Sequence, residues 1–289
     1  MPRSDAATIV IAKADDRAVR PAAETAHGFR LKDGAAVALD AAVAAEVPVA
    51  LVYNGTSHVV MMATPNDLAD FAIGFSLSEG ILTGTDELLG LEIEDGADGI
   101  QVQLEIVESA HDGLANRRRN LTGRTGCGLC GVDELVQVAR PLKPVGAGRK
   151  VPVSAIRRAL DSLQGLQTIN RQTGAVHASA WANPEGEIAL LREDVGRHNA
   201  LDKLIGAMAR SGVDFESGFA VITSRCSFEM VQKAATLGIP FLVAISAPTT
   251  MALRIAKRAG VTLVALARAD AMTVYANPGR ITGVEGMAS

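Results

Sequence analysis

The sequence predicts an α/β sheet covered by helices on both faces, preceded by a smaller α+β domain. From residue 198 onward helix-like and strand-like segments alternate, and the strand-like ones are continuous apolar runs, which is typical of strands buried on both faces. Before residue 107 the pattern instead indicates a hairpin, one helix and a half-buried strand. We therefore expect a mobile tail over residues 1–20, a small α+β domain over 21–123, a cysteine loop and linker over 124–148, and the α/β domain over 149–289.

The first predicted element is a hairpin. Residues 47–53 form a β-rich run with Pro48 near its start, where a missing backbone donor is best tolerated. Asn54-Gly55 follows, and this dipeptide between two β-rich runs is a strong turn signal, so 59–62 is the returning strand. Farther on, apolar residues alternate with polar ones over 100–106, which predicts a half-buried strand.

A helix is predicted between the hairpin and that strand. Thr64 is the expected N-cap, followed by a proline in the first turn and by Asp67 as an acidic third residue. The apolar residues after it share one helical face, and Gly80 is the expected stop.

The second domain begins after a Pro- and Gly-rich linker over 141–148, with Ser154 as the expected cap of a helix that carries Ile156, Leu160 and Leu163. The remaining predictions are strands at 176–182, 187–191, 219–223, 241–245 and 261–267, and helices at 198–210, 228–237 and 249–259.

Composition limits the function classes. The chain has 289 residues and a net charge of −4, so bulk charge offers no attraction for nucleic acid or for anionic membranes. The first residues lack the pattern of a signal peptide and no stretch is apolar for long enough to span a bilayer, so we expect a cytoplasmic protein. Three cysteines make a disulfide framework improbable.

Cys127 and Cys130 are the strongest candidates for chemistry. Glycines flank both residues, and a helix is expected to begin just after them, from Val132. The positive end of that helix, with Arg124 nearby, would favour thiolate over thiol. Four interpretations stay open at this point: a zinc site, a thioredoxin-like redox pair, a buried inert pair and a persulfide carrier. A zinc site would need more ligands, and Cys226 with His177 or His198 are the residues left to supply them.

Three polar connections in the second domain predict an anion site. They are residues 193–199, 224–227 and 246–250, each placed where a strand ends and a helix begins. Arg197 and Arg225 suit phosphate or pyrophosphate, so the expected ligand is nucleotide-like. Taken singly, Ser227 and Thr249 are more simply helix caps, and Cys226 a small, partly buried residue. His198 ranks above His177 as a functional histidine because charged residues, among them Asp202 and Lys203, crowd around it in sequence.

Four segments in order resemble the formate dehydrogenase accessory sulfurtransferases, and the resemblance covers residues 25 to 280. The segments are 124–131, 177–180 with 193–203, 227–231 and 246–249. The resemblance implies a sulfur carrier that receives persulfide sulfur from a cysteine desulfurase and hands it to molybdenum bis(molybdopterin guanine dinucleotide), which then activates formate dehydrogenase. It also implies a homodimer and a three-layer second domain similar in fold to cytidine deaminase. Deaminase chemistry itself is not expected, since no His-x-Glu precedes the cysteine pair.

The resemblance also assigns site residues. Cys127 matches the persulfide-forming cysteine and Cys130 its partner, and no resident metal is implied. Guanine nucleotide is the expected mimic of the bound cofactor. The residues expected to hold that cofactor are Leu266, Ala267, Arg268, Ala269, Asp270 and Ala271, together with Arg197, His198, Ser224, Arg225 and Ser246. The chain departs from the family pattern in lacking an aromatic residue near Leu266 and an asparagine near Thr273. A dithiol oxidoreductase and a non-covalent molybdenum-cofactor chaperone remain the alternative functions.

Overall fold

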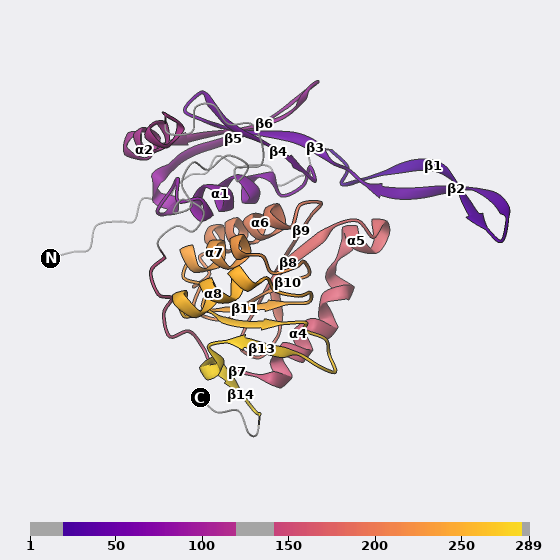
Figure 1. The fold of residues 1–289 in the computed structure, drawn as a ribbon. Coiled ribbons are helices and arrows are strands. Elements are labelled where there is room, and N and C mark those ends of the chain that lie inside the picture. The colour runs from indigo at the N-terminus through magenta and orange to yellow at the C-terminus, as the bar shows by residue number, and fades with distance from the viewer. Residues whose placement is uncertain (1–19, 120–141, 285–289) are drawn as a thin grey trace.

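The computed structural model describes residues 20–119 and 142–284, which form a mixed α/β architecture (Figure 1). Cys127, Cys130 and the helix expected after them lie outside the described residues, and so do residues 1–19 of the expected tail. Within the described part, no helix is long and apolar enough to cross a membrane.

The first half of the chain forms a four-stranded sheet. β3 (Val47–Tyr53) and β4 (Thr56–Ala63) form the predicted hairpin, and both turn residues, Asn54 and Gly55, have positive φ. β3 also pairs in parallel with β6 (Gly99–Ile106), which pairs with β5 (Leu88–Gly96), so the order is β4-β3-β6-β5. The hairpin and the strand over 100–106 are thereby confirmed, whereas β5 was not predicted. α2 (Glu108–Arg119) follows β6.

An arm that the sequence did not predict precedes this sheet. β1 (Ala23–Lys32) and β2 (Ala35–Ala44) pair antiparallel over ten residues each. Asp33 and Gly34 join them with φ angles of 51° and 77°, the two left-handed residues of a type I′ turn. The arm projects from the side of the molecule near α5 (Figure 1). Alanine, which has low β-propensity, makes up six of the ten residues of β2, and β1 carries three charged residues, a histidine and a glycine, so the sequence pattern did not reveal these strands.

The second half forms a six-stranded mixed sheet with the order β13-β12-β11-β10-β8-β9. β10, β11 and β12 run parallel, while β8 and β13 run antiparallel to their neighbours β10 and β12. The strands are β8 (His177–Ala182), β9 (Ile188–Asp194), β10 (Phe219–Ile222), β11 (Phe241–Ala244), β12 (Thr262–Ala265) and β13 (Thr273–Ala276). The helices are α4 (Val153–Leu166), α5 (Thr168–Thr173), α6 (Arg197–Arg210), α7 (Phe228–Thr236) and α8 (Thr250–Ala259). A small parallel pair, β7 (Val151–Pro152) with β14 (Ile281–Thr282), completes this half.

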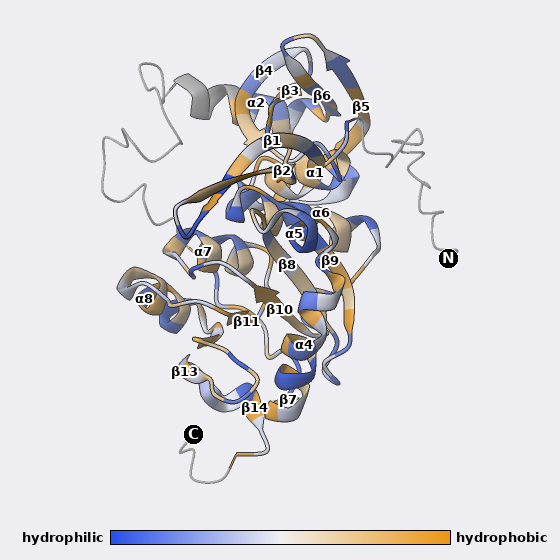
Figure 2. Cartoon of the chain, turned by 90° about the vertical axis from the view of Figure 1, so that its right-hand side faces the viewer, coloured by the Kyte–Doolittle hydropathy of each residue, from blue (hydrophilic) through white to orange (hydrophobic). Residues whose placement is uncertain are grey.

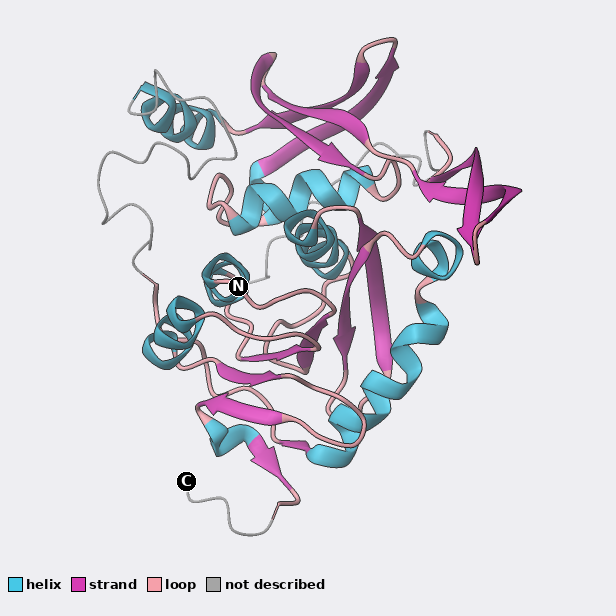
Figure 3. Ribbon diagram, turned by 45° about the vertical axis from the view of Figure 1, so that its right-hand side comes forward, coloured by secondary structure: helices cyan, strands magenta, loops and turns pink. Residues whose placement is uncertain are grey.

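Helices cover both faces of the six-stranded sheet, as predicted (Figure 3). Side chains alternate along each strand, so Val221 and Val243 pack with Ile156 of α4, whereas Ile222 and Ala244 belong to the cluster of α6, α7 and α8. Both faces are buried, which explains why these strands read as continuous apolar runs.

The two halves meet where α1 (Leu68–Ser78) crosses α6. All eleven residues of α1 are buried, because its own sheet lies on one side and α6 on the other. A methyl group at Gly74 would lie 1.7 Å from the carbonyl oxygen of Asp202, and one at Gly206 would lie 1.9 Å from that of Asp70. The two glycines therefore allow the helix backbones to touch.

Three boundary predictions were wrong. α1 begins at Leu68, and Thr64 instead accepts a hydrogen bond from the Val195 amide, 3.0 Å away, which ties the two halves together. α4 begins at Val153, so Ser154 lies inside the helix and is not its cap. The last predicted strand ends at Ala265, and Leu266 after it has a φ of 51°.

Candidate functional site at the helix-start edge

One edge of the six-stranded sheet gathers the starts of three helices. β10, β11 and β12 are parallel, so their carboxyl ends lie at this edge and lead to α7, α8 and β13. β8 is antiparallel to β10 and starts there with His177, which pairs with Asp194 at the end of β9. We call this the helix-start edge and define it as residues 195–198, 223–227, 245–249 and 266–268. Its position agrees with the predicted anion site.

Backbone hydrogen bonds hold the connecting segments of this edge side by side. The Ile245 amide donates to Ile222 at 2.9 Å, and the Leu266 amide donates to Ser246 at 3.1 Å. The Cys226 amide donates to Ala247 at 3.1 Å. The segments that follow β10, β11 and β12 are thus hydrogen-bonded to one another beyond the ends of the strands, which holds them in place at this edge.

The structure brings most of the predicted cofactor residues to this edge. Arg197 and His198 start α6, Ser224 and Arg225 follow β10, Ser246 follows β11, and Leu266 and Arg268 follow β12. Arg225, Leu266 and Arg268 are exposed, whereas Ser224 is buried and Ala267 packs into the core beneath the sheet. Ala269, Asp270 and Ala271 are exposed in the connection to β13.

Two polar atoms near this edge are buried without a hydrogen-bond partner among the described residues. They are Nε of Arg197, at the first position of α6, and Oγ of Ser179, two residues into β8 from His177. Buried polar groups in native proteins are nearly always paired, so these two atoms retain unused capacity to bind a ligand or a water. Ser179 was not a predicted cofactor residue, and it appeared only inside the segment that carried the family resemblance.

The two histidines of the edge differ in their surroundings. Nε2 of His198 lies 3.1 Å from Oε2 of Glu229 in α7, and Ser227 donates to the same oxygen at 2.9 Å. The hydrogen bond with His198 holds the pKa of Glu229 below its usual value, against the opposing effect of burial. Burial lowers the pKa of His177, and repulsion by Arg197 lowers it further, so His177 is neutral at pH 7.

Most charged residues that crowd His198 in sequence serve the contact between the halves instead. Lys203 and Asp194 form an ion pair at 2.7 Å with both side chains fully buried, and the Thr64 amide donates to Asp194 at 3.0 Å. Asp202 accepts a hydrogen bond from Ser78 of α1 at 2.7 Å and pairs with Lys233 of α7 at 3.0 Å. Crowding in sequence was therefore not evidence for function at these positions.

Glu193 has a local structural role as well. Its carboxylate accepts hydrogen bonds from the amides of Ile169 at 2.8 Å and Asn170 at 2.9 Å, at the start of α5. Such a carboxylate satisfies backbone donors that a helix start leaves unpaired.

Cys226 is a buried residue, in agreement with the simpler interpretation of it. Its side chain is fully inaccessible, and burial raises the pKa of its thiol to about 12. Among the described residues no group of three or more His, Cys, Asp or Glu side chains is arranged to hold a metal ion. Cys127 and Cys130, the other ligands of the zinc interpretation, lie outside the described residues.

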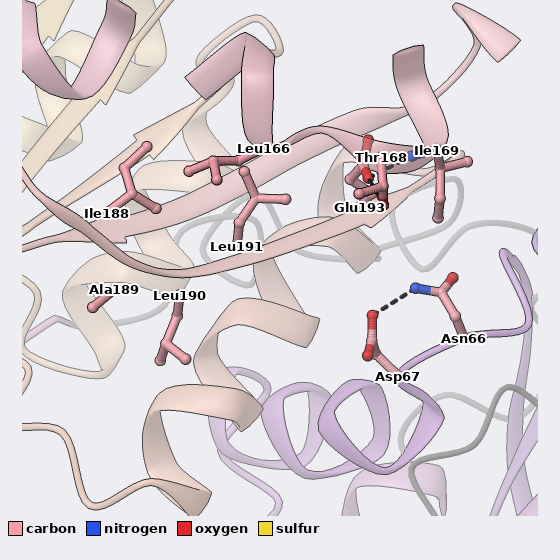
Figure 4. A pocket seen from close by; sticks show the side chains of 10 residues that line it. All are labelled: Asn66, Asp67, Leu166, Thr168, Ile169, Ile188, Ala189, Leu190, Leu191 and Glu193. Atoms are coloured by element: carbon pink, nitrogen blue, oxygen red, sulfur yellow. Dashed lines mark hydrogen bonds between the residues drawn. The ribbon is translucent and has the colours of Figure 1, made fainter. Parts of the chain in front are cut away.

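A pocket of about 320 Å³ lies beside β9, and none of the residues that define the helix-start edge lines it (Figure 4). Its polar groups are already engaged: Asn66 donates to Asp67 at 2.5 Å, and Glu193 is bound to α5. The two carboxylates, with no lysine or arginine in the lining, make this pocket unsuited to phosphate groups. None of the predicted cofactor residues lines it.

Comparison with known proteins gives a consistent result. Residues 44–282 match the model of the FdhD/NarQ family. The chain is 51% identical to the sulfur carrier protein FdhD of Variovorax paradoxus over 242 residues, which cover 84% of this chain and 87% of that protein. It is 53% identical to the FdhD of Bordetella bronchiseptica over 83% of this chain and 87% of the relative, and 49% identical to that of Xanthomonas euvesicatoria over 92% and 94%.

A solved structure also matches. The fold is similar to the crystal structure of a proposed formate dehydrogenase accessory protein from Desulfotalea psychrophila, with a TM-score of 0.72 and 26% identity. The match covers 91% of this chain and all of the other. The architecture described above, including both halves, therefore has a counterpart in an experimental structure.

Proposed function

Because this chain belongs to the FdhD/NarQ family, we propose that it carries persulfide sulfur on Cys127 from a cysteine desulfurase to molybdenum bis(molybdopterin guanine dinucleotide), the cofactor of formate dehydrogenase. The observation that carries the proposal is the close relation to sulfur carrier proteins over more than four-fifths of the chain. The range matched by the family model, residues 44–282, spans Cys127 and Cys130. The protein then acts as a sulfurtransferase whose substrate is the bound cofactor.

In the first step, persulfide sulfur moves from the donor to Cys127 without a net change in oxidation state. The Cys127 thiolate attacks the outer sulfur of the donor persulfide, so an S–S bond forms on Cys127 while the donor leaves as a thiolate. In the second step the Cys130 thiolate attacks the inner sulfur of the Cys127 persulfide. Sulfide then leaves toward the cofactor and a Cys127–Cys130 disulfide forms, which a cellular thiol reductant must reduce before the next cycle.

The helix-start edge is the proposed seat of the guanine dinucleotide. It offers three helix N-termini, and Arg197, Arg225 and Arg268 lie on it. Helix N-termini and guanidinium groups both favour phosphate oxygens. Nη1 of Arg268 donates to the carbonyl oxygens of Ile245 and Ala267, which fixes the guanidinium group while leaving its other N–H groups for a ligand. His177 and Ser179 extend this proposed set from the β8 side.

The proposal also covers the domain organisation, the cellular location and the partners of the protein. A smaller α+β domain over 21–123 and a three-layer domain over 149–289 similar to cytidine deaminase fit the two sheets and the helices on both faces of the larger one. A cytoplasmic location and a homodimer belong to the same proposal. Its partners are a cysteine desulfurase and formate dehydrogenase.

Sulfur loading tests the covalent step. The purified protein is incubated with a cysteine desulfurase and cysteine, and its intact mass is measured without reductant. We expect a sulfur-sized addition on the wild type and on Cys226→Ala, the matched control, and none on Cys127→Ala. Loading that persists in Cys127→Ala would contradict the proposal. Cys130→Ala should load normally but fail to release its sulfur.

Nucleotide binding tests the proposed seat. Loss of a charged hydrogen bond costs about 1.5–3 kcal/mol, so Arg197→Ala or Arg268→Ala should weaken binding of guanosine diphosphate by about tenfold or more in calorimetry. Arg157→Ala, an exposed change on α4 across the sheet, is the control and should leave binding unchanged. Equal affinity in all of these proteins would place the nucleotide elsewhere.

A further inference from the structure

The arm of β1 and β2 leaves a large apolar surface uncovered. Phe29 is 73% exposed and Leu31 79% on one face of the ribbon, and Val37, which pairs with Arg30, is 60% exposed on the other face. Neither strand pairs with any other strand in the described part of the chain, and α5 is the element of the body on which the arm mainly packs. A two-stranded ribbon is only marginally stable by itself, and patches of this kind mark interaction surfaces. Apolar colour is visible along the arm in Figure 2.

The tip of the arm, residues 28–39, combines apolar and basic groups. The register places Phe29, Leu31, Ala36 and Ala38 on one face. Arg30 and Lys32 alternate with them along β1, an edge strand, and their long side chains can reach around that edge.

A second uncovered surface combines apolar residues with acidic ones, and is thus complementary to the apolar and basic tip of the arm. The outer face of the β4-β3-β6-β5 sheet, on the side away from α1, carries Val60 and Met62 on β4, which are 59% and 47% exposed. Toward the other edge it carries three exposed carboxylates, which are those of Glu92, Glu94 and Glu105. Residues 33–116 contain no lysine or arginine, and all 28 lysines and arginines of the chain lie outside that stretch. No lysine or arginine within the sheet therefore neutralises this face.

We propose that the arm of one copy docks on the outer face of the four-stranded sheet of a second copy. Phe29 and Leu31 then cover Val60 and Met62, while Arg30 and Lys32 meet the acidic strip of Glu92 and Glu94. The inference specifies the interface of the homodimer named under the proposed function and rests on that part of it. Charge complementarity favours a second copy, because one chain presents both members of the match.

The size and symmetry of the contact are sufficient for a stable dimer. Ten residues per strand give an arm about 33 Å long. About half of the twenty strand residues of the arm face the sheet, and each copy supplies both an arm and a sheet, so the two contacts together approach the roughly 20–30 residues a side of a standard interface. In a twofold dimer the contact occurs twice, so both arms and both sheets are covered and no open chain of contacts is left.

Charge-reversed variants, alone and mixed with each other, test whether the arm and the sheet bind through complementary charge. The full-length wild type, followed by analytical ultracentrifugation, should be a dimer. Arg30→Glu with Lys32→Glu should raise the dimer dissociation constant by about tenfold or more, as should Glu92→Lys with Glu94→Lys. Mixing the two charge-reversed proteins should restore association as a mixed dimer, because both of its contacts then join an arm and a sheet of opposite charge. Glu108→Lys with Asp112→Lys in α2 gives the matched charge change off the sheet and should leave the dimer unchanged.

Cross-linking locates the contact. A carbodiimide joins amines to carboxylates without a spacer, so a mixture of ¹⁴N- and ¹⁵N-labelled copies should yield mixed-isotope links from Lys32 to Glu92, Glu94 or Glu105. A monomeric wild type, or a dimer that all reversals leave unchanged, would overturn the proposal and point to a client protein as the occupant. Because sulfur loading of Cys127 is read separately by mass, failure here would leave the sulfur-carrier proposal standing.

Discussion

At the scale of single residues, the segment around His198 separates into two roles that its sequence does not distinguish. Asp194 and Lys203 are fully buried and bind each other, whereas Arg197 beside them keeps its Nε unpaired at the helix-start edge. Pairing separates the roles, because Asp194 and Lys203 satisfy each other's charge, while the buried Nε of Arg197 has no partner among the described residues and can donate to a ligand. The partners lie far away in sequence, as Thr64 does from Asp194, and no local pattern reveals them.

The buried pair gives a stability prediction. Asp194→Ala leaves the Lys203 ammonium without its partner and should lower the free energy of unfolding by about 3–5 kcal/mol, measured by urea unfolding. Asp95→Ala, which removes a partly exposed pair with Arg20 at 2.6 Å, should cost about 1 kcal/mol or less. Similar losses in both variants would show that the Asp194 pair does not hold the halves together.

Cys226 gives a prediction about reactivity and pH. The alkylating species is the thiolate, and a pKa of about 12 leaves only about one thiol in ten thousand ionised at pH 8. Native Cys226 should therefore react with iodoacetamide about a thousandfold more slowly than in urea. The rate should rise about tenfold per pH unit up to the pKa, as read by peptide mass mapping. Rapid labelling of the native protein would refute burial of this thiol.

At the scale of elements, the sequence predicts the strands and turns whose residue pattern depends only on their own burial or backbone conformation. The central strands β10, β11 and β12 were predicted because both of their faces are buried, and the β3–β4 hairpin because its turn requires positive φ. The edge strand β13 was not predicted, because its short, partly exposed sequence lacks such an apolar run. The arm was missed because its alanines carry no signal, and the start of α1 because Thr64 binds the other half of the chain. The candidate edge could be predicted from strand–helix order, whereas the ion pairs beneath it required the fold.

The crossing of α1 and α6 gives a prediction at this scale. Gly74→Ala would force the backbones apart, since the added methyl would lie 1.7 Å from a carbonyl oxygen, and overpacking of this kind costs about 3 kcal/mol. Gly165→Ala in α4, where the methyl meets open space, should be neutral or stabilising by up to about 1 kcal/mol. Thermal and urea unfolding of both variants measure the difference. Equal stabilities would mean that the helices separate at little cost.

At the scale of the whole molecule, the two halves share one apolar cluster. Val49 and Phe71 of the first half belong to the same buried cluster as Leu201 and Ile222 of the second. Ion pairs also join the two halves, because Asp70 of the first half is neutralised by Arg192 and Arg210 of the second. The acidic first half therefore depends on the second for both apolar cover and counter-charge.

We predict that the halves unfold together despite their separate sheets. Trp181, the single tryptophan, is buried in β8 and reports on the second half by its fluorescence. Hydrogen exchange of peptides from β3 and β6 reports on the first half, and both probes should give the same urea midpoint because neither half can keep α1 or α6 covered alone. In Gly74→Ala both midpoints should fall by the same amount, whereas in Gly165→Ala neither should fall. Loss of protection in β3 and β6 at a urea concentration that leaves Trp181 native would instead show that the shared cluster divides and that the α+β part opens first.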